Sequence, residues 1–156
     1  MRPGRRMAID VGKVRIGVAI CDREAILSSP LDSVPRASSN PETISLLVEL
    51  ASKNDVFEVY VGDPISLSGT ETQSTADARE IAIQLAKSLQ IPVRLVDERF
   101  TTVTAASKLR AAGFNSKNSK SLIDSASAVE ILELALSSER DSGSAPGVEV
   151  GDSVGS

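Results

Sequence analysis

The chain has 156 residues, a formal net charge of −4 at pH 7, 41% hydrophobic residues and 24% charged residues. This length fits one globular domain. Histidine is absent, which excludes a Ser-His-Asp triad, a Cys-His pair and any histidine-ligated zinc or haem. Catalysis would have to use carboxylates, hydroxyls, lysine, arginine, the backbone or a bound cofactor.

Cysteine use and hydropathy bear on the cellular compartment. The one cysteine, Cys21, cannot form an internal disulfide, so we expect a cytoplasmic protein. No apolar run approaches the roughly 20 residues of a membrane span, and we expect neither a signal peptide nor a membrane partner. Residues 137–156 carry a net charge of −3. The rest of the chain is therefore close to neutral, which neither requires nor forbids a nucleic-acid partner.

Hydrophobic periodicity predicts a meander of strands followed by alternating strands and helices. In chain order the expected elements are strands at 7–11, 16–20 and 25–31, a helix within 38–53 capped by Asn40, a strand at 56–62, a helix over 78–89, a strand at 91–98, and helices at 101–113 and 121–137. This order predicts an α/β fold whose mixed five-stranded sheet is an antiparallel meander continued by parallel strands, with helices on both faces.

The two ends of the chain differ from its middle in composition. Residues 138–156 are rich in Ser, Gly and Asp and poor in large apolar residues, which predicts a disordered tail. Residues 1–5 read as a loose arm. The folded domain is therefore expected to span 6–137.

The first candidate site residue is Asp10, which lies inside an apolar strand between Ile9 and Val11. A carboxylate in a central strand is costly to bury unless it is paired or holds a metal. Gly12 permits a tight turn and the close approach of a ligand. The alternative is a strand-end aspartate that makes an Asx turn into Gly12 and Lys13.

Two further acids, Asp97 and Glu98, end the last predicted strand, where ligands bind in open α/β sheets. Adjacent strand residues point to opposite faces, so only one of the two can join Asp10 unless the strand has already ended. Capping of the next helix is the alternative role, which Thr101 could also fill. Arg99 beside them could pair with an acid or contact a phosphate.

Asp124 is the third acidic position. It shares a helix face with Ala128, Ile131 and Ala135, and that face should pack on the sheet. Helix capping is the alternative. If Asp124 converges with Asp10 and a strand-end acid, the oxygen ligands suit Mg²⁺ or Mn²⁺. Two such ions about 4 Å apart can cleave phosphodiesters.

The segment 61–74 is a Gly-, Pro-, Ser- and Thr-rich loop between a strand and a helix. Its backbone N–H groups and hydroxyls could hold a phosphate at the start of the helix. An ordinary strand-to-helix loop is the interpretation that the residues alone favour.

Four segments, AIDVGKVRIGVAI, VYVGDPISLSGTETQST, VRLVDERFTTVTA and IDSASAVEILE, together resemble the YqgF (RuvX) family. The resemblance spans about residues 7–137 and implies an RNase H-like fold related to the Holliday junction resolvase RuvC. It implies a nuclease of 16S ribosomal RNA maturation, with Asp10, Glu98 and Asp124 as catalytic and metal-binding residues. Between the two strand-end acids, it favours Glu98.

The resemblance also bears on substrate contacts. The residues expected to bind substrate are Gly12, Lys13, Arg15, Arg99 and Thr101; among them Gly12 and Arg15, together with Gly17, match the family pattern. The chain departs from the family at Asp63, where an apolar residue is usual. A carboxylate there could join a metal shell or repel phosphate.

The favoured hypothesis is an endonuclease that uses Mg²⁺ or Mn²⁺ to process the 5′ end of pre-16S ribosomal RNA, in contact with ribosomal particles and as a monomer or weak homodimer. One alternative is a resolvase acting on branched DNA, which would need a dimer. Another is a non-catalytic RNA-binding factor of ribosome maturation. Actin-like ATPases also carry Asp-x-Gly, but they need two such subdomains and this chain has room for one.

Overall fold

The computed structural model describes residues 1–66, 68–100 and 122–151. Its strands are β1 (Arg5–Val11), β2 (Arg15–Cys21), β3 (Ser28–Pro35), β4 (Val56–Asp63), β5 (Val93–Asp97) and β6 (Val148–Val150). Its helices are α1 (Asn40–Lys53), α2 (Gln73–Ser88) and α5 (Ala126–Ser142), and a short 3₁₀ turn, η1, spans Glu98–Phe100. The helix predicted at 101–113, and Thr101 with it, lies outside the described residues.

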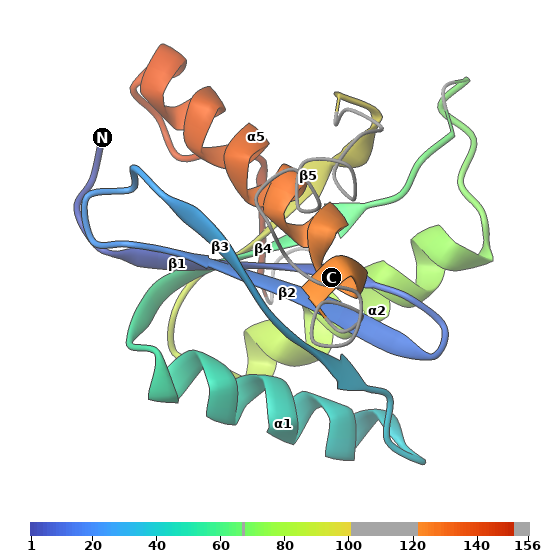
Figure 1. The fold of residues 1–156 in the computed structure, drawn as a ribbon. Coiled ribbons are helices and arrows are strands. Elements are labelled where there is room, and N and C mark those ends of the chain that lie inside the picture. The colour runs from blue at the N-terminus through green and yellow to red at the C-terminus, as the bar shows by residue number, and fades with distance from the viewer. Residues whose placement is uncertain (67, 101–121, 152–156) are drawn as a thin grey trace.

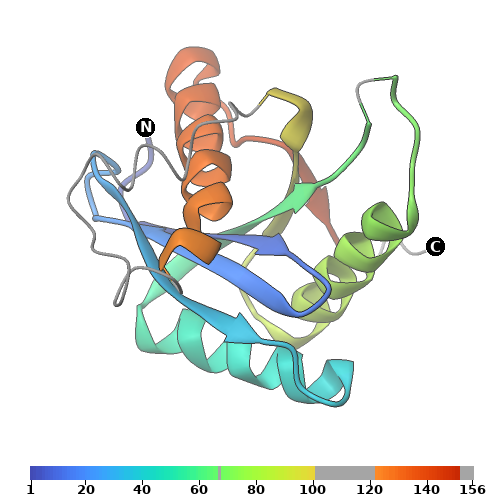
Figure 2. The ribbon, with the colours of Figure 1, turned by 45° about the vertical axis from the view of Figure 1, so that its right-hand side comes forward.

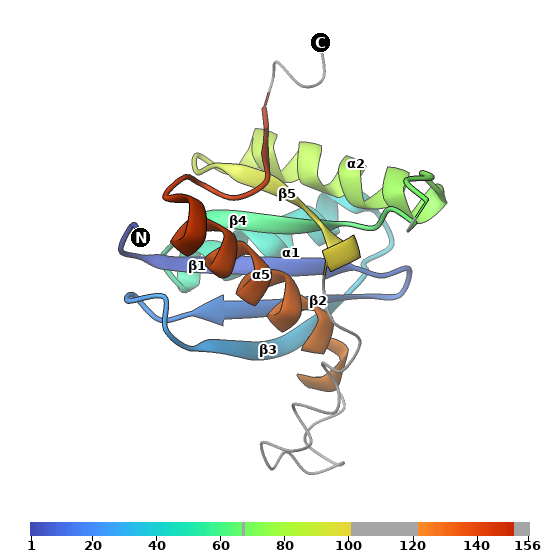
Figure 3. The same cartoon turned by 90° about the horizontal axis from the view of Figure 1, so that it is seen from above.

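The strands form one six-stranded sheet in the order β3-β2-β1-β4-β5-β6. β1, β2 and β3 form the antiparallel meander, while β4 pairs parallel to β1 and β5 parallel to β4. Helices α1 and α2 cover one face of the sheet and α5 covers the other (Figures 1 and 3). The predicted mixed α/β fold is confirmed, with one strand more than the five expected.

The alternation of side chains along β1 divides the core between the two faces of the sheet. Met7 and Ile9 belong to the cluster packed under α1 and α2, whereas Ala8 belongs to the cluster under α5. Since successive strand residues point to opposite faces, Asp10 follows Ala8 to the α5 face. The same rule places Tyr60 of β4 on that face, where it joins the α5 cluster.

Helix starts differ slightly from the prediction. Ser39, not Asn40, caps α1, and its side chain accepts a hydrogen bond from the Glu42 amide. Helix α2 begins at Gln73, one turn earlier than the apolar pattern indicates, and a reciprocal capping box between Thr72 and Thr75 closes its N-terminus. The first turn of α2 is polar, so hydrophobic spacing could not reveal it.

Composition predicts a loose arm at residues 1–5 and a disordered tail at 138–156, but the described parts of these segments include the start of β1, the end of α5 and β6. Helix α5 continues to Ser142, and β6 pairs antiparallel with β5. The N-terminal arm is held by Arg2, which donates hydrogen bonds to Glu58 and Glu139. Fully buried Arg6 also bonds Glu139. Ion pairs hold the N-terminal arm, while β6 is held by its pairing with β5 and by the buried Val150.

This ion network predicts how stability depends on pH. Burial alone would raise the pKa of Glu139, but hydrogen bonds from Arg2 and the charge of Arg6 outweigh it and lower the pKa from 4.5 to about 2. A depressed folded-state pKa stabilises the protein above the unfolded value, and that stability is lost as pH falls from about 4.5 toward 2. Glu139 should therefore stabilise the folded state more at pH 7 than in acid.

Urea unfolding measured between pH 2 and 7 checks this expectation. Glu139→Gln should remove much of the acid-sensitive part of the stability, whereas Glu133→Gln on the exposed side of α5 should leave the pH profile of the parent protein. Identical profiles for the parent and Glu139→Gln would contradict this role of the network.

Among the residues that the structure describes, none of the helices combines the length and apolar character required to cross a membrane.

Candidate active site

Asp10 and Glu98 form a hydrogen-bonded pair of carboxyl groups at the edge of the sheet where the parallel strands end. Asp10 is half-buried near the end of β1, and Glu98 is the first residue of η1, directly after β5. Burial, followed by the charge of Asp10 and the hydrogen bond to it, raises the pKa of Glu98 to about 8. Burial also raises the pKa of Asp10. The two carboxyl groups therefore titrate as a coupled pair that retains one proton more readily than two separate carboxyl groups would.

The alternative acid, Asp97, points away from this pair. It is the last residue of β5, and its carboxylate accepts bonds from Arg99, with 2.6 Å between Oδ2 and Nη2. Hydrogen bonds from Arg99 hold the pKa of Asp97 below its usual value. The strand ends between the two acids, and the turn into η1 brings Glu98 rather than Asp97 to Asp10.

Two glycines beside Asp10 make room for other parts of the site. Gly17 of β2 lies opposite Asp10 in the sheet register. On the other side of β1, Ile9 pairs with Val61, so the next residue of β4, Gly62, lies beside Asp10. A Cβ on Gly62 would collide with Glu98 Oε1 and lie 2.5 Å from Ile131 Cδ1. A Cβ on Gly17 would lie 2.5 Å from the Asp124 carbonyl oxygen. At Gly17 the obstacle is backbone, so glycine is required there, whereas a Cβ at Gly62 would force the ends of the Glu98 and Ile131 side chains to shift.

Ser125 fixes the start of α5 over this part of the sheet. Its fully buried hydroxyl accepts a bond from the Val18 amide, 2.9 Å away, and donates to the Leu31 carbonyl, 2.6 Å away. The register of the β2–β3 pairing shifts between Ile16 and Val18, and the Ser125 hydroxyl bridges the two strands at this shift. These bonds hold the backbone of neighbouring Asp124 against Gly17, one strand away from Asp10.

The Asp124 side chain itself faces solvent and Arg15, with 3.8 Å between Oδ2 and Nε. The described residues contain no group of three or more Cys, Asp or Glu side chains arranged to hold a metal ion. The structure therefore brings Asp10 and Glu98 together, and it places Asp124 beside them with its carboxylate paired to Arg15.

The predicted substrate contacts surround the turn between β1 and β2. Lys13 and Arg15 are exposed there, and the Gly12 amide donates to the Arg15 carbonyl, 3.0 Å away. Arg36 anchors the turn to α2 because it donates both to the Gly12 carbonyl and to Asp77. A cleft of about 390 Å³ lies between this turn and the start of α2, which run close together in Figure 2.

Asp63 is the position at which the chain departs from the family pattern. Its carboxylate is paired with an arginine and is not a free charge beside the carboxyl pair. Its carboxylate accepts two bonds from Arg79 of α2, at 2.9 and 3.0 Å. The third nitrogen of Arg79 lies 3.0 Å from Glu71. The sequence analysis did not identify Arg79. The pattern that could have indicated this ion pair is an arginine on the next helix, sixteen residues after an aspartate at the end of a strand.

The donors around Asp10 suit a small divalent cation. The pair offers carboxylate oxygens alone, the ligand type that Mg²⁺ and Mn²⁺ prefer. A half-buried pair of acids that must share a proton in the absence of other charges is the environment in which a cation replaces the proton. The space left by Gly62 accommodates the Glu98 carboxylate. The residues of the pair thus fit such an ion.

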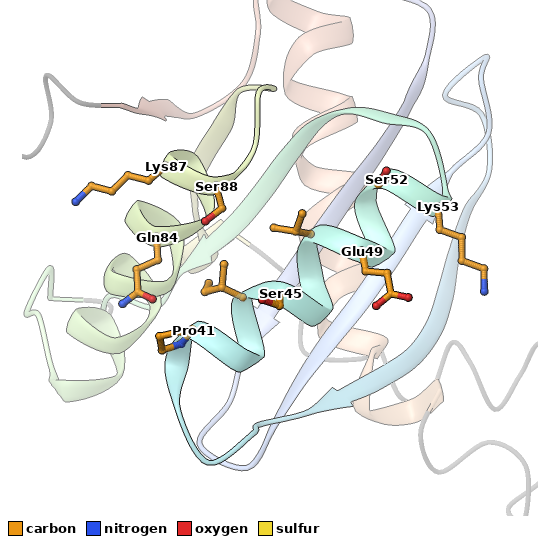
Figure 4. A pocket seen from close by; sticks show the side chains of 10 residues that line it. Pro41, Ser45, Glu49, Ser52, Lys53, Gln84, Lys87 and Ser88 are labelled. Atoms are coloured by element: carbon orange, nitrogen blue, oxygen red, sulfur yellow. The ribbon is translucent and has the colours of Figure 1, made fainter.

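A second concave region lies far from the carboxyl pair, between α1 and α2 (Figure 4). It measures about 880 Å³ and is lined by the apolar Ile44 and Val48 together with serines and both signs of charge. It carries no part of the site described above.

A mixed sheet with this order of strands, and acids grouped at the carboxyl ends of its central strands, defines the RNase H-like class of folds. The fold is similar to that of Thermus thermophilus RuvC in complex with a Holliday junction substrate, with a TM-score of 0.61 at 14% sequence identity, over 92% of this chain and 99% of that chain.

The chain belongs to the RuvX family, whose model, described as Holliday junction resolvase, matches residues 4–138. A protein of Streptomyces coelicolor named "Putative pre-16S rRNA nuclease" is 50% identical over 94% of this chain and 88% of its own length. A protein of the same name from Clavibacter michiganensis is 45% identical over 96% of this chain and 93% of its own length.

Proposed function

We propose that this protein is a divalent-metal-dependent endonuclease that processes the 5′ end of pre-16S ribosomal RNA. The observation that carries the proposal is the Asp10–Glu98 carboxyl pair at the ends of β1 and β5 in a chain of the RuvX family. The names of the relatives support the substrate.

Asp10, Glu98 and Asp124 would hold the cation. A bound Mg²⁺ or Mn²⁺ supplies Lewis-acid stabilisation of the phosphoryl oxygens and a more acidic water. Asp10 is held rigidly by its strand, and Glu98 by the turn after β5. Asp124 would rotate from Arg15, a partner 3.8 Å away at the surface, because an exposed ion pair of that length contributes little stability.

The cationic side chains around the pair would bind the RNA backbone. Lys13 and Arg15 extend from the exposed β1–β2 turn on one side of the acids, and Arg99 lies on the other side, oriented by Asp97. Phosphate contacts of this kind position a strand without reading its sequence. Selection of the cleavage site would therefore depend on the shape of the precursor or on ribosomal particles.

Labelled precursor RNA tests the proposal with purified full-length protein. We expect cleavage at the mature 5′ end with Mg²⁺ or Mn²⁺ and none with EDTA. Tight binding without cleavage under all ion conditions would instead favour a non-catalytic maturation factor. Metal-dependent cleavage of a four-way DNA junction, with the RNA left intact, would favour a resolvase.

A further inference from the structure

Three hydroxyl side chains form a cluster on the loop between β4 and α2, which we call the hydroxyl turn (Ser66, Ser68 and Thr70). Ser66 Oγ lies 2.9 Å from Ser68 Oγ, which lies 3.0 Å from Thr70 Oγ1. The Thr70 amide donates to Ser66 Oγ, and the Ser66 amide donates to the Thr70 carbonyl. All three side chains are exposed. The two hydroxyl–hydroxyl bonds use two of the three hydroxyl protons, which leaves one for a ligand.

Ion pairs and a capping residue fix the position of the hydroxyl turn. Arg79 bonds Asp63 before the turn and Glu71 after it, and so bridges the two ends of the loop. Thr75 Oγ1 donates to the Pro64 carbonyl, 2.5 Å away. A loop tied to both the strand and the helix loses little conformational entropy when it binds a ligand.

Arg99 faces the hydroxyl turn. Its Nε and Nη2 donate to Asp97, and its third nitrogen, Nη1, would lie 3.7 Å from a Cβ built on Gly69. Gly69 lies between two residues of the cluster, and its amide donates to the Ser66 carbonyl. The third guanidinium nitrogen of Arg99 therefore lies close to the middle of the hydroxyl turn, at Gly69.

We propose that the hydroxyl turn and Arg99 together bind one phosphodiester group of the substrate strand, next to the one that is cleaved. A guanidinium and hydroxyl donors are the groups that proteins use for phosphate oxygens. Arg99 follows Glu98 in the chain, so this phosphate would lie at the same end of the sheet as the carboxyl pair. The inference rests on the proposed function for the identity of the strand.

Binding of a fluorescent 12-nucleotide single-stranded RNA, and of the matching DNA, to the full-length protein in EDTA tests this site. Thr70→Val and Arg99→Gln should each weaken binding about tenfold, the usual loss for one hydrogen bond to a charged group. Arg99→Gln should also lower the slope of log affinity against log salt by about 1. RNA and DNA should be affected equally because the contact is to phosphate. Millimolar inorganic phosphate should leave binding nearly unchanged, since a multi-phosphate strand outcompetes it.

If Thr70 and Arg99 bind the same phosphate, the effects of the two substitutions on affinity should not be independent. Thr70→Val with Arg99→Gln should lose clearly less affinity than the product of the two single losses. Thr70→Ser, which keeps the hydroxyl, should restore affinity and so exclude simple damage to the loop. The matched controls are Arg23→Gln, at the opposite edge of the sheet, and Ser45→Ala, in the α1–α2 groove of Figure 4.

Parent-like binding by Thr70→Val, or a double loss equal to the product of the single losses, would overturn the proposal. Full competition by inorganic phosphate would show a site for the free ion and overturn it as well. Because these measurements exclude metal and cleavage, they are independent of the nuclease assay. The expected binding pattern without any cleavage would sustain this site and reject the proposed function.

Discussion

Asp10→Asn should lower the rate of metal-dependent cleavage of pre-16S RNA by about a thousandfold, because it removes the most central ligand of the proposed cation site. The fold should survive. Burial disfavours the ionised form of Asp10, so the metal-free variant should melt at the same temperature as the parent protein or higher. Single-turnover cleavage and thermal unfolding are the two measurements.

Asp32→Asn is the matched control for this change. Asp32 is an exposed aspartate on the edge strand β3, and its replacement should leave cleavage unchanged. An Asp10→Asn protein that is folded and cleaves at the parent rate would contradict the assignment of Asp10.

Gly62→Ala should disturb the carboxyl pair directly. The added methyl group would collide with Glu98 Oε1 and crowd Ile131 at 2.5 Å, so Glu98 must move from Asp10. A displacement of about 1 Å in a reacting group typically costs about a hundredfold in rate. Overpacking of this kind also costs about 1–3 kcal/mol of stability. Cleavage rates and urea unfolding would record both losses.

Gly151→Ala provides the comparison, since a Cβ there would have nothing within 4 Å. It should change neither cleavage nor stability. Full activity in Gly62→Ala would show that Glu98 is not needed where the structure places it.

The central strands and the unusual position of Asp10 could be predicted because their causes are local. Alternating or continuous apolar runs define β1, β2 and β4, and a carboxylate inside such a run marks Asp10 as unusual. The choice between Asp97 and Glu98 could not be made from the residues alone. It depends on the single position at which β5 ends and η1 begins, and the family resemblance favoured the acid that the structure places at Asp10.

The parts that sequence reasoning missed depend on contacts between distant segments. Arg79 meets Asp63, and Arg2 meets Glu139, across intervals that no hydrophobic period spans. The Arg2–Glu139 pair also ties the N-terminal arm to the end of α5, although composition predicts that both segments are loose. Gly17 and Gly62 look like ordinary strand glycines until the register places both beside Asp10.

The central claim is that these carboxylates hold a divalent cation, and anomalous diffraction from crystals soaked in MnCl₂ tests it most directly. We expect an anomalous peak bonded to carboxylate oxygens of Asp10 and Glu98, with Asp124 turned from Arg15 toward the ion. A peak at other residues only, or no peak beside Asp10 at millimolar Mn²⁺, would contradict the account.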